Sequence, residues 1–402
     1  MAVVITGIGT RSPLGSSVAE SMDTLRSGTP CVGDIRNLDT RGYGITAAGE
    51  IRHGGEVVRT APSVERKVHF FGEALTELDE QTRFTSRYAP AERMLNVGGG
   101  VDYFDIEGYL DAKEDDSRNV ADSSFYHKMG KEFRELAEAW GFGAGCHLFA
   151  SACTASAHAI GLSARLLRKG LVQAIVTGGA DSMINHPNYL GFSSLGTLAG
   201  GDAPAAQRCK PCDRNANGTV LSEAAVALLL EDSTRLAPGI APLAELCGYG
   251  CTMDAYSVTD PDPSGEQAAR AIQAALDDAG ISPDEIDCVH LHGTGTVKCG
   301  PAEYNALRLV FGERASSLPA YSMKGQVGHS IGSCTAVEML GVVYSLQHQV
   351  VLPTVNFSVP HPLAPFRMVT GEALHTPIRY LLKLNSAFGG HNTALVFKRW
   401  EQ

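Results

Sequence analysis

Short apolar runs alternate along the chain with longer amphipathic stretches, and many of the runs end in glycine. The apolar runs predict strands at residues 3–8, 94–97, 174–177, 224–230, 242–249, 288–291 and 394–397. The amphipathic stretches predict helices at residues 64–78, 153–169, 266–279, 303–311 and 333–347. Strands that alternate with helices of this length are typical of βαβ units. We therefore expect an α/β fold with a mostly parallel sheet.

Two short motifs occur twice in the same order. Ser-Ala-Cys-Thr-Ala at 151–155 opens one predicted helix, and Gly-Ser-Cys-Thr-Ala at 332–336 opens another. Val-Gly-Gly-Gly at 97–100 ends one predicted strand, and His-Gly-Thr-Gly at 292–295 ends another. Because two independent motifs recur in the same order, the sequence favours a duplicated α/β unit.

The duplication predicts two halves, at residues 1–240 and 241–402, in which Cys153 and Cys334 open equivalent helices. The stretch at 103–141 is more polar and more charged than its surroundings. We interpret it as an insertion with helices in the first half, serving as a lid or a dimer contact.

Composition narrows the class of protein. The chain has 402 residues, of which 44% are hydrophobic and 19% charged, as in compact globular proteins. A net charge of −11 argues against a nucleic-acid binder. No run of 18 apolar residues predicts a membrane span, and the apolar start lacks the basic segment of a signal peptide. Ten scattered cysteines favour reduced thiols in a cytoplasm over a disulfide framework.

Cys153 is the candidate nucleophile. It follows an apolar run and stands at the start of a predicted helix. Only a thiolate attacks a thioester well, and a helix N-terminus lowers the pKa of a cysteine from about 8.5. The alternative is a buried, inert cysteine that packs as a small apolar side chain, as most free cysteines do.

Two histidines far downstream lie in separate Gly-rich turns. His292 opens His-Gly-Thr-Gly-Thr, and His329 stands in Gly-His-Ser-Ile-Gly. A neutral imidazole donates a hydrogen bond to developing negative charge or shuttles a proton. Lys324, just upstream of His329, can orient a carboxylate or tune the histidine. Each of these residues alone has a structural alternative, but together with Cys153 they predict a cysteine acyl-transfer site.

The order of the motifs resembles that of the elongating β-ketoacyl-[acyl-carrier-protein] synthases, which have the thiolase fold. The resemblance spans nearly the whole chain. It rests on Val4-Ile-Thr-Gly-Ile-Gly, Ser151-Ala-Cys153-Thr-Ala, Pro211-Cys-Asp213, His292-Gly-Thr-Gly-Thr, Lys324 with Gly328-His329-Ser-Ile-Gly, and Phe388-Gly-Gly-His-Asn392. It implies two βαβ halves in a layered αβαβα architecture.

The resemblance also implies a reaction and a role for each matching residue. Cys153 takes an acyl chain from a carrier protein as a thioester, while His292 and His329 help to decarboxylate malonyl-carrier protein and stabilise the enolate that attacks that thioester. No metal or redox cofactor is implied, because the phosphopantetheine belongs to the carrier protein. The resemblance also implies supporting roles. Lys324 and Glu338 would form an ion pair, Glu303 matches a family glutamate, and the hydroxyls of Thr294 and Thr296 would bind the pantetheine arm. Phe388 would be a gate, and its backbone N–H would form the oxyanion hole together with that of Cys153.

Departures from the family pattern bear on the pathway. Val297 and Gly300 replace a proline and an aspartate, and Ser386-Ala387 replaces Phe-Gly before Phe388. Alanine does not readily adopt a positive φ, so we expect a stiffer gate. These changes favour a discrete (type II) ketosynthase of a specialised polyketide or unusual fatty-acid pathway. A housekeeping fatty-acid elongation synthase, a non-elongating acyltransferase and a structural partner subunit stay open as alternatives.

Carrier-protein docking predicts a basic patch, since carrier proteins are acidic. Arg66, Lys67, Arg208 and Lys210 match family positions near the pantetheine entrance, with ordinary surface charge as the alternative. The resemblance implies a homodimer, and a heterodimer with a chain-length-factor-like subunit stays open.

Two cysteine pairs suggest a metal site as a further alternative. They are Cys209 with Cys212, and Cys247 with Cys251. The long separation between the pairs departs from the regular spacing of a four-cysteine zinc site, so we do not expect a metal there.

Overall fold

Each half of the chain contributes one set of strands to a large central sheet. The computed structural model describes residues 1–42, 44–60, 65–100, 103–105, 109–110, 113–114 and 125–401. The first set of strands is β1 (Val3–Arg11), β6 (Arg93–Gly99), β9 (Cys146–Phe149), β10 (Ala174–Ser182) and β11 (Glu223–Asp232). The second set is β12 (Ala244–Met253), β13 (Ile286–His290), β14 (Pro319–Tyr321), β18 (Tyr380–Ser386) and β19 (His391–Lys398). β16 (Arg367–Met368) extends the edge beside β14.

The two sets have the same strand order and the same directions. The first runs β1-β11-β10-β6-β9 and the second β12-β19-β18-β13-β14. In both, the first two pairings are antiparallel and the next two parallel. The sets meet through a short antiparallel pairing of β1 with β12, at Val4↔Glu245 and Ile5↔Ala244. This symmetry is what a duplicated unit produces.

The expectation of a mostly parallel sheet is wrong, since five of the ten pairings in this sheet are antiparallel. β18 and β19 are joined by a tight turn at 387–390, which can only connect antiparallel neighbours. The apolar pattern did not predict β18, because Lys383 interrupts the run and hides the strand.

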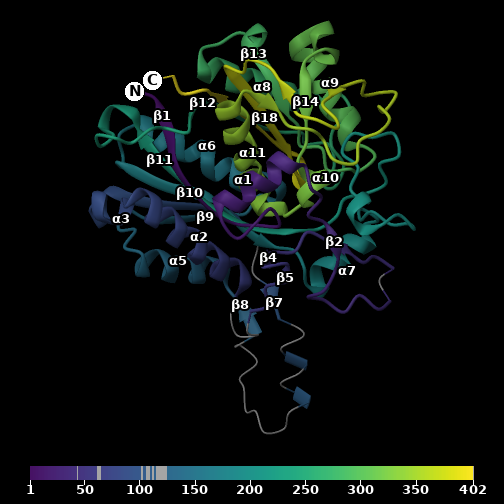
Figure 1. Ribbon diagram of the computed structural model, residues 1–402, viewed down its shortest axis with the longest axis horizontal. Coiled ribbons are helices and arrows are strands. Elements are labelled where there is room, and N and C mark those ends of the chain that lie inside the picture. The colour runs from purple at the N-terminus through teal and green to yellow at the C-terminus, as the bar shows by residue number, and fades with distance from the viewer. Residues whose placement is uncertain are drawn as a thin grey trace.

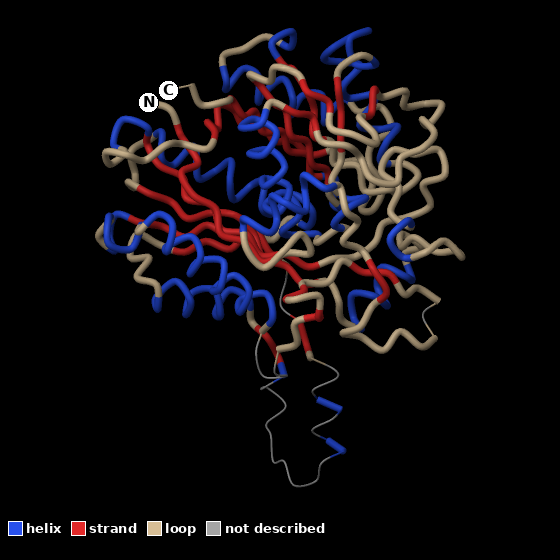
Figure 2. Tube along the Cα trace, in the orientation of Figure 1, coloured by secondary structure: helices blue, strands red, loops and turns tan. Residues whose placement is uncertain are grey.

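Helices cover both outer faces and fill the middle, as Figures 1 and 2 show. α2 (Arg66–Thr82) and α5 (Met129–Ala139) lie on the outer face of the first strand set. α8 (Glu266–Ala279) and α9 (Cys299–Phe311) lie on the outer face of the second, and α6 (Ala155–Arg168) packs with α11 (Cys334–His348) between the sets. The predicted αβαβα layering is confirmed by this arrangement of the helices and the two strand sets.

Shorter elements decorate this frame. The further α-helices that the structure describes include α1 (Val18–Ser27), α3 (Phe84–Arg87), α7 (His186–Ser194) and α10 (Lys324–Val327). Two-residue strands pair as β2 (Gly33–Asp34) with β3 (Ala47–Ala48), β4 (Arg52–His53) with β5 (Glu56–Val57), β7 (Tyr103–Phe104) with β8 (Tyr126–His127), and β15 (Val350–Val351) with β17 (Leu374–His375). The predicted insertion at 103–141 lies partly outside the described residues. No helix in the described ranges has both the length and the apolar character needed to cross a bilayer.

The central helices begin unusually close to the strands beneath them. Every residue of α11 from Cys334 to Leu346 is buried, as expected for a helix that is enclosed on all sides. Gly98 on β6 permits the close approach of α6, because a Cβ there would lie 2.1 Å from the backbone nitrogen of Ser156. The turns that start α6 and α11 are thereby held against the sheet.

These two turns define the internal repeat more accurately than the sequence motifs do. The turn η3 (Ala152–Thr154) precedes α6, and η8 (Ile331–Ser333) precedes α11. Both open on a residue with positive φ, +47° at Ala152 and +43° at Ile331. The helices are equivalent, as predicted, but Cys153 corresponds to Gly332 and not to Cys334. The sequence match is out of register by two residues, because Cys153 is the second residue of η3 whereas Cys334 is the first residue after η8.

Candidate active site

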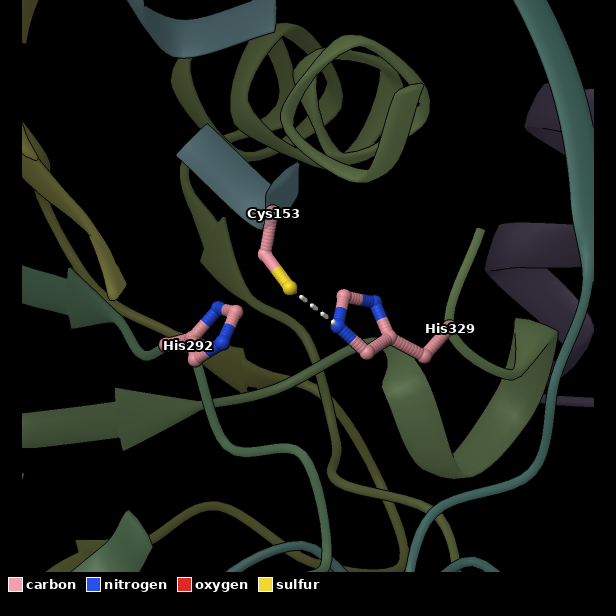
Figure 3. A group of neighbouring side chains, drawn as sticks. All are labelled: Cys153, His292 and His329. Carbon is pink, nitrogen blue, oxygen red and sulfur yellow. Dashed lines mark hydrogen bonds between the residues drawn. The ribbon is translucent and has the colours of Figure 1, made fainter. Parts of the chain in front are cut away.

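Cys153 lies in the turn η3, between the end of β9 and the start of α6. Its Sγ is 3.1 Å from Nε2 of His329, and the side chain is only 5% exposed (Figure 3). The preceding residue, Ala152, adopts a left-handed conformation that costs an L-residue about 1–2 kcal/mol. Packing of α6 in the central layer holds this turn, so the fold fixes the direction of the thiol.

His292 follows β13 and is fixed through its backbone. The two carboxylate oxygens of Glu303, on α9, accept the N–H groups of His292 at 2.6 Å and Gly293 at 2.9 Å. Glu303 therefore shapes the turn that carries His292. Figure 3 shows the ring of His292 facing Cys153 and His329, and the two imidazole rings meet edge to face at 5.4 Å.

His329 is held by a loop of the first half. Its N–H donates to the carbonyl of Val220 at 2.7 Å, and its carbonyl accepts the N–H of Ser222 at 3.0 Å. Chain segments from both halves of the duplication therefore join at the site.

The expected ion pair of Lys324 and Glu338 forms beneath the histidines. Nζ of Lys324 lies 2.5 Å from Oε1 of Glu338 and donates to the carbonyl of His292 at 2.7 Å. Both side chains are buried, so removal of one partner would strand a charge at a cost of about 3–5 kcal/mol.

Burial sets the protonation states of the three reactive groups. Burial raises the pKa of the Cys153 thiol well above its usual value, and the nearby Lys324 ammonium only partly opposes this. Burial and the Lys324 charge hold the pKa values of His292 and His329 well below the usual range. The expectation of a lowered thiol pKa is therefore wrong for the resting site, which pairs a neutral thiol with neutral imidazoles.

One pocket connects these groups. Cys153, His292 and His329 line it together with Thr294 and Thr296, whose hydroxyl oxygens lie 2.8 Å apart. The pocket therefore brings together a thiol, two imidazoles and a pair of hydroxyls.

Phe388 lines the same pocket as the expected gate. Its ring stacks on that of Phe192 at 5.9 Å, and its backbone N–H has no hydrogen-bond acceptor within the described chain. The expected stiffening by Ala387 does not follow, because Ala387 is extended at φ −144°. The positive φ angles occur after Phe388, at Gly389 and Gly390, where glycine is retained.

Two of the residues expected at a docking surface point inward. The guanidinium of Arg66 forms two 2.6 Å bonds to the buried carboxylate of Glu223, and Nζ of Lys67 lies 3.3 Å from Oδ1 of Asp181. Lys67 is 5% exposed, so both cations stabilise the interior and are unsuited to docking. Sequence alone could not reveal this, because a basic pair at a helix start is usually solvated.

The other two expected docking residues are partly accessible. Arg208 donates from Nε to the carbonyl of Ala203 at 3.0 Å and from a guanidinium nitrogen to Thr46 at 3.3 Å. Lys210 is half-buried.

Two groups of side chains in the described ranges have metal-ligating geometry. The ligand atoms of Cys153, His292 and His329 lie within 4.8 Å of one another, as do those of Glu65, His127 and Glu132. The first group faces the buried ammonium of Lys324, which disfavours a second cation. No such group in the described chain includes Cys209, Cys212, Cys247 or Cys251, and all ten cysteines are free thiols.

Sequence reasoning missed three buried polar residues around Glu338. Lys383 pairs with its Oε2 at 2.9 Å, Asn385 lies 3.5 Å from the same oxygen, and His290 has Nε2 3.9 Å from Oε1. A lysine inside the apolar run at 380–384 was the available signal, because burying a charge requires a specific partner.

Known proteins share this organisation. The family model for the N-terminal domain of β-ketoacyl synthases matches residues 1–235, and that for the C-terminal domain matches residues 243–358. The 3-oxoacyl-[acyl-carrier-protein] synthase 2 of Staphylococcus aureus (strain COL) is 31% identical over 415 residues, which cover 99% of this chain and 98% of the relative.

Solved ketosynthase structures superpose on the whole chain. A type II polyketide acyl-carrier protein in complex with its ketosynthase, bound to the hexaketide, matches with a TM-score of 0.88 and 24% identity, covering 100% of this chain and 99% of that one. The ishigamide ketosynthase/chain length factor matches with a TM-score of 0.86 and 26% identity, covering 100% and 99%. The chain thus belongs to the β-ketoacyl synthase family and is a ketosynthase of the acyltransferase class.

Proposed function

We propose that this ketosynthase loads an acyl group onto Cys153 and condenses it with malonyl-carrier protein, with loss of CO₂. The observation that carries the proposal is the convergence of the Cys153 thiol with two neutral imidazoles, His292 and His329, in one pocket. A thiol supplies the acyl acceptor, and neutral imidazoles both accept and donate protons.

Loading begins with proton transfer. As Sγ of Cys153 attacks the acyl thioester, His329 accepts the thiol proton at Nε2 across 3.1 Å. The carrier thiolate leaves and takes up that proton. The backbone N–H groups of Cys153 and Phe388 are available to the oxyanion of the tetrahedral intermediate.

Condensation is driven by cleavage of the bond between the malonyl carboxylate and the adjacent carbon. The C–C bond to the carboxylate cleaves, CO₂ departs, and the electron pair forms an enolate whose oxygen accepts hydrogen bonds from His292 and from His329, whose neutral ring by then carries its proton on Nε2. The enolate carbon then attacks the acyl carbon on Cys153, and Sγ leaves as a thiolate that takes up one proton from solvent. The balance needs no oxidant and no metal, so we propose that the enzyme uses no cofactor of its own.

We infer that an acyl carrier protein is the partner, with Thr294 and Thr296 binding its pantetheine arm. The polyketide complexes among the structural relatives favour a discrete ketosynthase of a specialised pathway. The Staphylococcus relative supports fatty-acid elongation as the second candidate. We place the enzyme in the cytoplasm, in keeping with its free thiols, as a homodimer or beside a chain-length-factor-like subunit.

Intact mass spectrometry after incubation with a panel of acyl-carrier proteins tests this proposal. We expect the wild type to gain one acyl group, and Cys153→Ala to gain none and to form no β-ketoacyl product. Cys153→Ser, whose side chain has the same shape and is only slightly smaller, separates loss of the nucleophile from loss of packing. A wild-type protein that forms no adduct with any acyl group would support a structural subunit instead.

A further inference from the structure

Strand β18 carries two buried polar side chains, Lys383 and Asn385, whose roles the reaction above does not explain. They are 0% and 2% exposed. As alternate residues of a strand they face the same side, toward Glu338 of α11 and the turn that holds His292.

The amide of Asn385 reaches the inner nitrogen of His292. Its Nδ2 lies 3.2 Å from Nδ1 of His292 and 3.5 Å from Oε2 of Glu338. A carboxylate only accepts hydrogen bonds, so the nitrogen of the amide, rather than its oxygen, must face Glu338. Asn385 therefore donates toward Nδ1.

A second donor faces the same ring nitrogen. Nζ of Lys324 lies 3.4 Å from Nδ1 of His292, and an ammonium has protons but no lone pair. With donors on two sides, Nδ1 must carry the lone pair. The ring proton of neutral His292 then resides on Nε2.

Lys383 stabilises this arrangement from behind. Its Nζ lies 2.9 Å from Oε2 of Glu338, 2.6 Å from the carbonyl of Leu384 and 3.4 Å from that of Leu291. Three acceptors match the three protons of an ammonium. Lys383 thus holds one oxygen of Glu338 and leaves the other to Lys324.

We propose that Asn385 and Lys383 are positioning residues that keep the proton of His292 on Nε2, from which it is donated to the enolate oxygen. Neither side chain lines the described pocket, so each acts through His292 or Glu338. The inference rests on the proposed function, since it assigns His292 its donor role in the malonyl step. Acylation of Cys153, which uses His329, does not need that proton.

Asn385→Asp tests the assignment most directly. Its carboxylate accepts a hydrogen bond and so draws the proton to Nδ1, which leaves a lone pair facing the enolate. We expect decarboxylation of malonyl-pantetheine to fall about 100-fold or more, as when one oxyanion donor is lost. Acylation of Cys153 by an acyl-pantetheine should stay within about threefold of wild type. Lys383→Met should lower decarboxylation by a smaller factor and likewise spare acylation.

Asn96→Asp is the matched control. Asn96 is a buried asparagine on β6 that also contacts a histidine, with Oδ1 2.8 Å from Nδ1 of His147. The substitution is the same but lies on another strand, so both rates should match those of the wild type.

Nitrogen-15 NMR of histidine-labelled protein reads the tautomer without relying on activity. The His292 signals are those lost in His292→Gln. We expect the proton on Nε2 in the wild type and on Nδ1 in Asn385→Asp. A wild-type proton on Nδ1, or equal loss of acylation and decarboxylation in Asn385→Asp, would overturn the inference. Absence of both reactions in the wild type would contradict the proposed function instead, and the NMR result would still decide the tautomer.

Discussion

The turns that precede α6 and α11 have similar backbone conformations but contribute different reactive groups to the site. Each opens on a residue with positive φ, Ala152 in the first half and Ile331 in the second. Cys153 follows the first of these residues, whereas His329 precedes the second by two positions. Each half of the duplication therefore supplies one member of the thiol–imidazole pair, joined at 3.1 Å.

What each turn faces explains the difference. Cys153 projects its thiol into the pocket. The equivalent Gly332 instead packs on the sheet, where a Cβ would lie 2.7 Å from the backbone carbon of Gly99 and 2.8 Å from Oδ2 of Asp181. The N–H of Gly332 donates to that same carboxylate oxygen at 2.9 Å. The helix N-terminus is common to both turns, so the reactive thiol depends on surroundings rather than on the turn alone.

The largest expected effect comes from moving the thiol to the other turn. In Cys153→Ala/Gly332→Cys the new side chain meets backbone atoms that cannot yield, so we expect no acyl adduct by intact mass spectrometry. Gly332→Cys alone should also lower the free energy of unfolding by about 1–3 kcal/mol, the usual cost of overpacking. Urea titration measures that loss.

Gly130→Ala/Cys153→Ala, with its glycine substitution at an exposed position of α5 where a Cβ would meet no atom within 4 Å, is the reference for that double variant. It carries the same loss of the nucleophile without the crowding at the sheet. Acylation of the relocated cysteine at a rate near that of wild type would show that the two turns are interchangeable.

The sequence predicted the duplication and the residues of the site, but it did not predict which residues of the two turns are equivalent. Motif order placed Cys153, His292 and His329 together and indicated the duplication. The sequence alignment of Cys153 with Cys334 was wrong because it rested on the shared tripeptide Cys-Thr-Ala. The backbone gives the correct alignment, in which Ala152 and Ile331, both with positive φ, are equivalent. The Cys334 thiol instead donates to the carbonyl of Cys153 at 3.1 Å, a supporting contact.

Buried charge was the other limit of sequence reasoning. Arg66 and Lys67 resembled a surface pair, while Lys383 was hidden within an apolar strand that the pattern missed. Local sequence does not reveal which distant carboxylate a cation will meet. Glu223, Asp181 and Glu338 come from other elements and are brought to these cations only by the fold.

The second half should also carry most of the loss of stability at acid pH. Burial lowers the pKa values of His290, His292 and His329 well below the usual range, while that of His158 in the first half falls to about 4. The unfolded chain takes up protons on these histidines below about pH 6.5. Stability should therefore be complete above that pH and fall as the pH drops, by up to about 1.4 kcal/mol per unit for each histidine.

His290→Phe isolates one of these contributions. Within the described chain neither ring nitrogen has a hydrogen-bond partner, and the ring stacks on Tyr321 at 4.2 Å, so phenylalanine should fit. Urea unfolding between pH 7.5 and 5 should show a shallower pH dependence by up to about 1.4 kcal/mol per unit. An unaltered slope in His290→Phe would mean that His290 is protonated in the folded protein.

The smallest expected effect concerns the strained residue before the nucleophile. Ala152→Gly removes the cost of a left-handed alanine, about 1 kcal/mol, but gives the unfolded chain a comparable gain in entropy. The free energy of unfolding should stay within about 1 kcal/mol of wild type. Ile331→Gly gains the same relief but loses a buried side chain, so it should cost about 2–4 kcal/mol. If packing of α6 places the thiol, Ala152→Gly will load acyl groups at the wild-type rate. A large loss of loading with unchanged stability would instead assign that placement to the strained turn itself.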